Sequence, residues 1–179
     1  MIHPIKHFRV ITKHRHKVIY HCARCGILWR GLMHDLSKYT PTEFIPGAKY
    51  YLGTRSPNEA ERNEKGYSSA WLHHKGRNRH HFEYWTDYNM AEKRIMPVKM
   101  PFVFVVEMFC DRVAASKIYQ GEKYTDNHPI EYFEKGKLTR TIHPETSDLL
   151  ESLLVMLRDK GEKETFAHIK GLVKSKFTY

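Results

Sequence analysis

Three side chains capable of metal or proton chemistry lie within five residues of one another, at His34, Asp35 and Lys38. Neutral imidazole nitrogen and ionised carboxylate oxygen are ordinary ligands of divalent cations, so the His34-Asp35 pair forms half of a candidate metal site. Neighbouring side chains diverge in a regular helix or strand, and the two can converge on one ion only where a helix ends. The pattern therefore predicts a helix end at this dipeptide, with the remaining ligands supplied by other segments.

A further acidic position lies inside the most apolar helix that the sequence predicts, Met100–Tyr119. This segment is apolar on almost every side and should cross the core. It carries Glu107 and Asp111 four residues apart, on one face. A buried carboxylate costs several kcal/mol unless it is paired or bound to a metal, so we expect a cation beside Asp111. A salt bridge to a distant basic side chain is the alternative.

Histidine is concentrated in one short segment. The chain has thirteen histidines, and four of them lie in nine residues. We expect His73 and His74 to close one helix and His80 and His81 to open the next, with a turn over Gly76–Asn78, so that two imidazole pairs face each other. A polar surface loop is the alternative, but two doublets around one turn favour metal binding.

One more imidazole comes from the helix predicted to begin at Thr12. Its apolar stripe includes Val18 and Ile19 at helical spacing. His16 projects close to Ile19, and His14 projects close to Val18. Periodicity alone does not choose between the two histidines.

The length of 179 residues fits one domain, and the hydrophobic content of 41% is ordinary for a globular protein. No apolar run approaches the roughly 18 residues of a membrane span, and the amino terminus lacks the pattern of a secretory signal. We expect a soluble, cytoplasmic protein without a membrane partner. The three cysteines should be reduced, with Cys22 and Cys25 packed on a helix face rather than engaged in a zinc or redox site.

Helix signals recur along the chain, whereas strand signals do not. Starts are predicted at Thr40–Pro41, at Ser56–Pro57 and at Pro144. The polar stretch 121–143 is expected to be an excursion in a position to cover the site, and helices within 144–177 are expected to be structural. The prediction is an all-α fold in which residues 1–179 form a single domain.

The order of the candidates, a helical histidine, then His34-Asp35, then paired histidines, then Asp111, resembles the motif of the HD-domain superfamily of metal-dependent phosphohydrolases. The match covers residues 12–121, and it implies an HD-type helical bundle. Within that superfamily the chain is similar to an uncharacterised group with the same paired histidines. The resemblance implies these metal ligands: His16, with His14 as the alternative, together with His34, Asp35 and Asp111 for a first ion, and His74, His80 and His81 for a second. His73 is expected instead to pack beside Trp71 and Leu72.

The resemblance implies a hydrolase that uses one or two divalent ions, drawn from Mn, Fe, Co, Ni, Zn and Mg. Such an ion lowers the pKa of a bound water, and the resulting hydroxide could attack phosphorus. Asp35 and Lys38 are the expected catalytic residues, and Lys38, Arg77, Asn78 and Arg79 are the expected substrate-binding residues. The net charge of +10 suits a small phosphorylated substrate such as a nucleotide.

Two alternatives belong to other functional classes. The superfamily also resembles a di-iron oxygenase branch, which would use the same scaffold for different chemistry. The second alternative is a basic nucleic-acid-binding protein with a non-catalytic metal. Its support is a set of aromatic residues interleaved with basic ones between positions 67 and 85.

Overall fold

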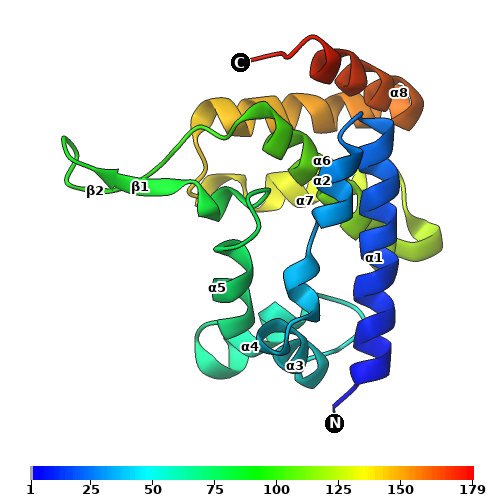
Figure 1. The fold of residues 1–179 in the computed structure, drawn as a ribbon, viewed down its shortest axis with the longest axis vertical. Helices are drawn as coiled ribbons and strands as arrows, with labels where there is room; N and C mark the ends of the chain where they lie inside the picture. The colour runs from blue at the N-terminus through cyan, green and yellow to red at the C-terminus, as the bar shows by residue number, and fades with distance from the viewer. Residues whose placement is uncertain (1) are drawn as a thin grey trace.

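The computed structural model describes residues 2–179, and it confirms the all-α prediction (Figure 1). The α-helices are α1 (Pro4–Arg24), α2 (Leu28–Met33), α3 (Pro41–Lys49), α4 (Pro57–Lys65), α5 (Ser69–Lys75), α6 (Phe102–Gln120), α7 (His128–Lys135) and α8 (Pro144–Lys174). The shorter 3-10 helices are η1 (Leu36–Tyr39), η2 (Phe82–Tyr84), η3 (Gly121–Lys123) and η4 (Lys137–Thr139). A two-stranded sheet is formed by β1 (Thr86–Asn89) and β2 (Arg94–Pro97).

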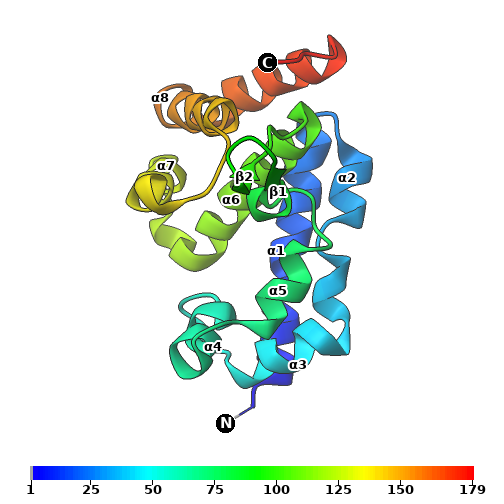
Figure 2. The same ribbon diagram turned by 90° about the vertical axis from the view of Figure 1, so that its left-hand side faces the viewer.

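Helix α6 runs through the middle of the molecule, as its apolar composition predicts. It packs against α1, α7 and α8, and α1 packs along α2 (Figure 2). Phe109 and Val113 of α6 are fully buried, as are Leu154 and Leu157 of α8. Burial of one such side chain contributes roughly 1.5–3 kcal/mol, so this core, to which Val18 of α1 also belongs, fixes α6 beside α8 and α1.

The other end of the molecule holds α3, α4 and α5: α3 packs on α1, and α4 and α5 pack on α3. The His3 amide donates to the Ala48 carbonyl over 2.9 Å and joins the start of α1 to α3. Helix α5 packs against α3, and the chain then returns toward α6 through η2 (Figure 1). The histidine-rich turn therefore lies between the two ends of the molecule.

Three segments differ from the predictions. Helix α1 begins at Pro4 rather than near Thr12, and α8 joins the two expected carboxy-terminal helices across a kink at Gly161, where φ is 73°. The stretch 121–143 contains α7, which buries Ile130 and Phe133 and packs on α6 and α8. This excursion is therefore largely part of the helical packing.

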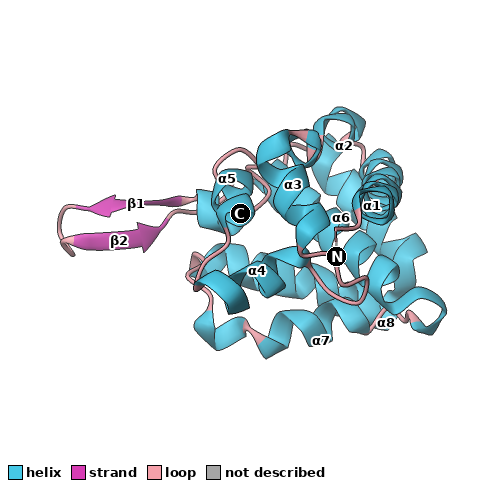
Figure 3. Cartoon of the chain, turned by 90° about the horizontal axis from the view of Figure 1, so that it is seen from below, coloured by secondary structure: helices cyan, strands magenta, loops and turns pink. Residues whose placement is uncertain are grey.

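The unpredicted element is the hairpin of β1 and β2, in which Tyr88 pairs with Ile95 in antiparallel register. It projects away from the helices (Figure 3). Both of these side chains are exposed, so this hairpin has no buried face of its own to give the alternating pattern that identifies a strand in sequence.

The cysteines are free thiols in the core, as expected. Cys22, Cys25 and Cys110 are fully buried, and the sulfurs of Cys25 and Cys110 lie 3.6 Å apart. Within residues 2–179, every helix is too short or too polar to cross a membrane.

Candidate metal centre

The helix end predicted at His34-Asp35 is present, and it makes the two side chains converge. Helix α2 ends at Met33, His34 is extended with ψ of 129°, and Asp35 is left-handed with φ of 55°. Aspartate tolerates this conformation better than most residues. The Arg15 side chain donates to the His34 carbonyl over 3.1 Å and also to the Leu32 carbonyl, which holds the end of α2 against α1.

We define centre A by four residues whose ligand atoms lie within 4.8 Å of one another: His14, His34, Asp35 and Asp111. His14 Nε2 lies 3.0 Å from Asp111 Oδ1, and His34 Nε2 lies 3.2 Å from Asp35 Oδ2. The imidazoles come from α1 and the end of α2, and the carboxylates come from the left-handed turn and α6. Centre A therefore joins three separate segments at one point.

We define centre B by Asp35, His74, His80 and His81, whose ligand atoms meet the same 4.8 Å limit. His74 Nε2 lies 3.2 Å from Asp35 Oδ1 and 2.9 Å from His81 Nε2, so one imidazole of the first doublet faces the second doublet, whereas His73 turns to Glu43. Asp35 belongs to both centres: Oδ2 faces centre A and Oδ1 faces centre B. A carboxylate in this position can bridge two cations.

Several ligand atoms of the two centres are buried without the hydrogen-bond partners that buried polar atoms require. Across residues 2–179, the buried atoms that have no hydrogen-bond partner include Nε2 of His14, His34 and His80, and Oδ1 of Asp35. An unpartnered buried polar atom costs on the order of 1–3 kcal/mol, and these atoms point at one another. A cation between them removes that cost, so the residues fit a divalent metal at each centre.

Glu107 fixes one imidazole of each centre. Its Oε1 lies 3.0 Å from His34 Nδ1 and 3.2 Å from His80 Nδ1, and its Oε2 accepts from Arg30 Nε over 2.8 Å. Burial opposes the charged form, but the hydrogen bonds from the two histidines lower the pKa of Glu107 to about 2. A carboxylate that holds Nδ1–H leaves Nε2 with its lone pair free for a metal.

Glu43 fixes the imidazole of His74 in the same way, by holding its Nδ1 atom. Its two oxygens lie 2.7 Å from His74 Nδ1 and 2.6 Å from His73 Nδ1. Burial disfavours its charge, but the hydrogen bond and charge of His74 outweigh that effect and lower the pKa of Glu43. The preference for His74 over His73 agrees with this geometry, although His73 pairs with Glu43 rather than simply packing beside Trp71 and Leu72.

The Lys38 ammonium lies 2.5 Å from Asp35 Oδ2, at the edge of centre A. Burial opposes its charge, but the carboxylates of Asp35 and Asp111 outweigh burial and raise the pKa of Lys38, which is therefore cationic at neutral pH. The side chains of Lys38 and Asp111 are 31% and 18% exposed, whereas that of His34 is fully buried. A molecule from solvent therefore reaches centre A past Lys38 and Asp111.

The choice of His16 as the first ligand needs correction. His16 is exposed and takes no part in either centre, and His14 stands in the predicted place. Residues two apart on a helix point in nearly opposite directions, so only one of the pair can face α6. The buried stripe of α1 contains His7, His14 and His21 at seven-residue spacing, a signal that the sequence offered.

The predicted substrate-binding residues of the histidine-rich turn do not reach the centres as expected. Arg77 and Arg79 are exposed, and the Arg79 guanidinium lies 5.6 Å from the Tyr84 ring. Asn78 is buried and donates to the Ser37 hydroxyl and the His74 carbonyl, each over 2.8 Å. Its amide thus holds the turn, and it is directed at protein atoms rather than at an open site.

A model of one protein family matches residues 3–156, and its description reads Family of unknown function (DUF5662). The chain belongs to this family. No curated protein and no solved structure matches the chain. All seven residues of the two centres lie within the matched range.

Proposed function

We propose that the protein is a metal-dependent phosphohydrolase that acts on a nucleotide or a similar small phosphorylated molecule. The observation that carries this proposal is the convergence of unpartnered imidazole and carboxylate atoms on both oxygens of Asp35, beside the Lys38 ammonium. The ordered motif that resembles the HD-domain superfamily supports the same reading, once His14 replaces His16.

The donor set indicates which ions suit the centres. Centre A offers two imidazoles and two carboxylates, and centre B offers three imidazoles and the shared Asp35 carboxylate. Imidazole suits Mn, Fe, Co, Ni and Zn better than it suits Mg, which prefers oxygen ligands. We therefore propose one of these transition metals at each centre.

A divalent ion bound here would supply two functions, a bound water of lowered pKa and polarisation of a phosphoryl oxygen. Asp35 would hold both centres at a fixed separation through its two oxygens. Lys38, which stays protonated beside Asp35, would offset the negative charge that develops on the phosphoryl oxygens. His34 and His80, held by Glu107, would keep their Nε2 atoms directed inward throughout.

The substrate class rests on charge and access. A net charge of +10 raises the encounter rate of an anionic substrate, and the exposed edge of centre A carries the cationic Lys38. A cytoplasmic location is part of the proposal, and the free thiols of the three buried cysteines support it.

The test is a screen for phosphate release across nucleotides and small phosphate esters, with metal supplied after treatment with a chelator. His34→Ala should abolish metal-dependent release while leaving the helical circular dichroism intact. His16→Ala is the matched control. His16 is exposed and belongs to neither centre, so this variant should retain activity. Unchanged turnover in His34→Ala would contradict the proposal.

The di-iron oxygenase alternative shares the two centres and is distinguished by the metal and by oxygen. Two irons per chain together with oxygen uptake, and no phosphate release from any ester in the screen, would favour that alternative. The predicted aromatic surface for nucleic acid is less well supported, because Phe82 and Trp85 pack against the hydrophobic core. Trp85 also donates its indole N–H to the Arg79 carbonyl over 2.7 Å.

A further inference from the structure

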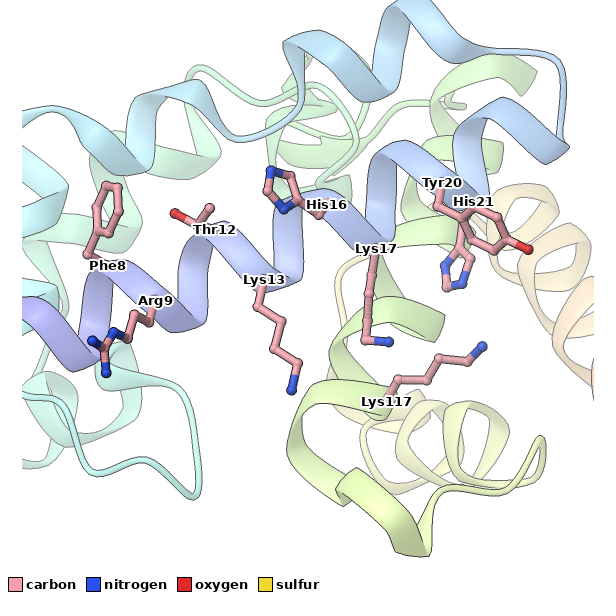
Figure 4. Close-up of a pocket in the computed structure, with 9 residues that line it drawn as sticks. All are labelled: Phe8, Arg9, Thr12, Lys13, His16, Lys17, Tyr20, His21 and Lys117. Atoms are coloured by element: carbon pink, nitrogen blue, oxygen red, sulfur yellow. The ribbon is translucent and has the colours of Figure 1, made fainter.

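A groove with a volume of about 570 Å³ runs along α1, and the residues of centres A and B do not line it (Figure 4). Three cations of α1, Arg9, Lys13 and Lys17, project to one side of this helix, and Lys117 of α6 extends past Lys17 toward His21. Successive members of the α1 set are four residues apart. They therefore form a row on one helix face that is about 12 Å long at 1.5 Å per residue.

The row is not neutralised by the protein. Within the part of the chain that the structure describes, no aspartate or glutamate lines the groove, and Arg9, Lys13 and Lys17 form no ion pair. Lys117 is the exception, since it pairs with Glu162. Like charges four residues apart destabilise a helix by roughly 0.2–0.5 kcal/mol per pair, and the row contains two such pairs. An anionic ligand would relieve this repulsion.

Two exposed aromatic rings project from a different face of α1, near the two ends of the row (Figure 4). Phe8 is 49% exposed and Tyr20 is 60% exposed, and both line the groove. They are twelve residues apart on α1, which corresponds to about 18 Å. Cations that follow a backbone, together with aromatic rings on which bases stack, are the combination by which proteins bind single-stranded nucleic acid.

We propose that the α1 groove binds a strand of single-stranded nucleic acid, with Arg9, Lys13 and Lys17 contacting successive phosphates. This inference does not depend on the proposed phosphohydrolase activity, because the groove shares no residue with either centre. The ligand is an extended strand rather than a mononucleotide, since one row of separated cations contacts more than one nucleotide.

The test measures fluorescence anisotropy of a labelled oligothymidylate of about 12 nucleotides, with chelator present so that the metal centres do not contribute. Lys13→Gln/Lys17→Gln should bind at least about tenfold more weakly than the wild type. Three phosphate contacts predict a slope of about −2 in log K against log salt for the wild type, and the variant should fall to about −0.7. Lys160→Gln/Lys163→Gln is the control, because it removes the same charge from exposed positions of α8.

Three results would overturn the proposal. The first is an absence of binding by the wild type at low salt. The second is an equal loss of affinity in the α1 and α8 variants, which would indicate attraction by net charge alone. The third is displacement of the labelled oligonucleotide by ATP when the ATP concentration equals the concentration of nucleotides in the strand. That result would indicate a site for small polyphosphates.

Discussion

Replacing Glu107 by alanine should weaken metal binding at both centres, although Glu107 contacts neither proposed ion. Its single Oε1 atom holds Nδ1 of His34 in centre A and Nδ1 of His80 in centre B. Without this acceptor, each ring can rotate or change tautomer and lose the inward direction of its Nε2 lone pair. Loss of such a carboxylate partner typically costs 10–100-fold in metal affinity, which is about 1.4–2.7 kcal/mol per ion.

The assay is a competition titration of the apoprotein with zinc or cobalt against a chromophoric chelator, which resolves the number of ions and the affinity of each. Glu43→Ala is the matched control, because Glu43 is similarly buried and holds His74 of centre B but no residue of centre A. We expect Glu107→Ala to weaken two ions and Glu43→Ala to weaken one. Thermal melting of the apoproteins checks that both variants fold.

Binding of both ions by Glu107→Ala with wild-type affinity would contradict this role of Glu107. So would a Glu43→Ala variant that weakens both ions while Glu107→Ala weakens one. Either result would mean that the carboxylates do not orient the imidazoles in the way that their hydrogen bonds indicate.

Three further predictions follow from particular side chains. His14→Ala should bind one ion fewer than the wild type and His16→Ala should bind the same number, as measured by elemental analysis; the opposite pattern would return the ligand role to His16. Lys38→Gln should keep both ions and lower kcat/KM for phosphate ester hydrolysis by about 10²–10³-fold, and wild-type turnover would remove Lys38 from the chemistry. Burial, aided by the nearby charge of Lys117, lowers the pKa of His21 from 6.5 to about 4. The unfolded chain therefore binds a proton that the folded chain excludes, and the free energy of unfolding should fall by about 3 kcal/mol as the pH decreases from 6.5 to 4. In chelator, urea titrations of His21→Leu should lack this part of the pH dependence, and identical curves for the two proteins would contradict it.

The sequence predicted the parts of the site that depend on local pattern. The His34-Asp35 dipeptide required a helix end, and the structure has one at the left-handed Asp35. Asp111 inside an apolar helix led us to expect a cation beside it; the structure brings the imidazoles of His14 and His34 to this carboxylate, and the cation itself stays a prediction. These inferences hold because the cost of an unpaired buried charge is independent of the rest of the fold.

The parts of the site that the sequence did not predict depend on which helices pack against each other in the fold. The apolar stripe around Val18 and Ile19 placed both His14 and His16 near it, and the contact between α1 and α6 separates the two histidines. The seven-residue spacing of His7, His14 and His21 was the sequence signal that favoured His14. Glu107 was recognised as sharing a face with Asp111, but its role required the position of His80, which is far away in sequence. Glu43 gave no signal at all, since it reads as an ordinary acidic residue in the first turn of α3.

Arg77 and Arg79 were assigned to substrate from their proximity to histidines in the sequence. In a turn of this kind, successive side chains alternate between the interior and solvent, and the structure buries His80 and Asn78 while it exposes both arginines. Proximity along the chain is therefore a weaker guide to a shared site than the need of each buried polar atom for a partner.

The most direct test of the account is the number of divalent ions per chain in the wild type and in Asp35→Ala, measured by elemental analysis after gentle purification. Asp35 contributes one oxygen to each centre, so the wild type should hold two transition-metal ions and Asp35→Ala should lose both. Asp111→Ala, which alters centre A alone, should retain one. A wild-type protein without metal, or an Asp35→Ala variant with two ions, would contradict the central claim that Asp35 bridges two metal centres.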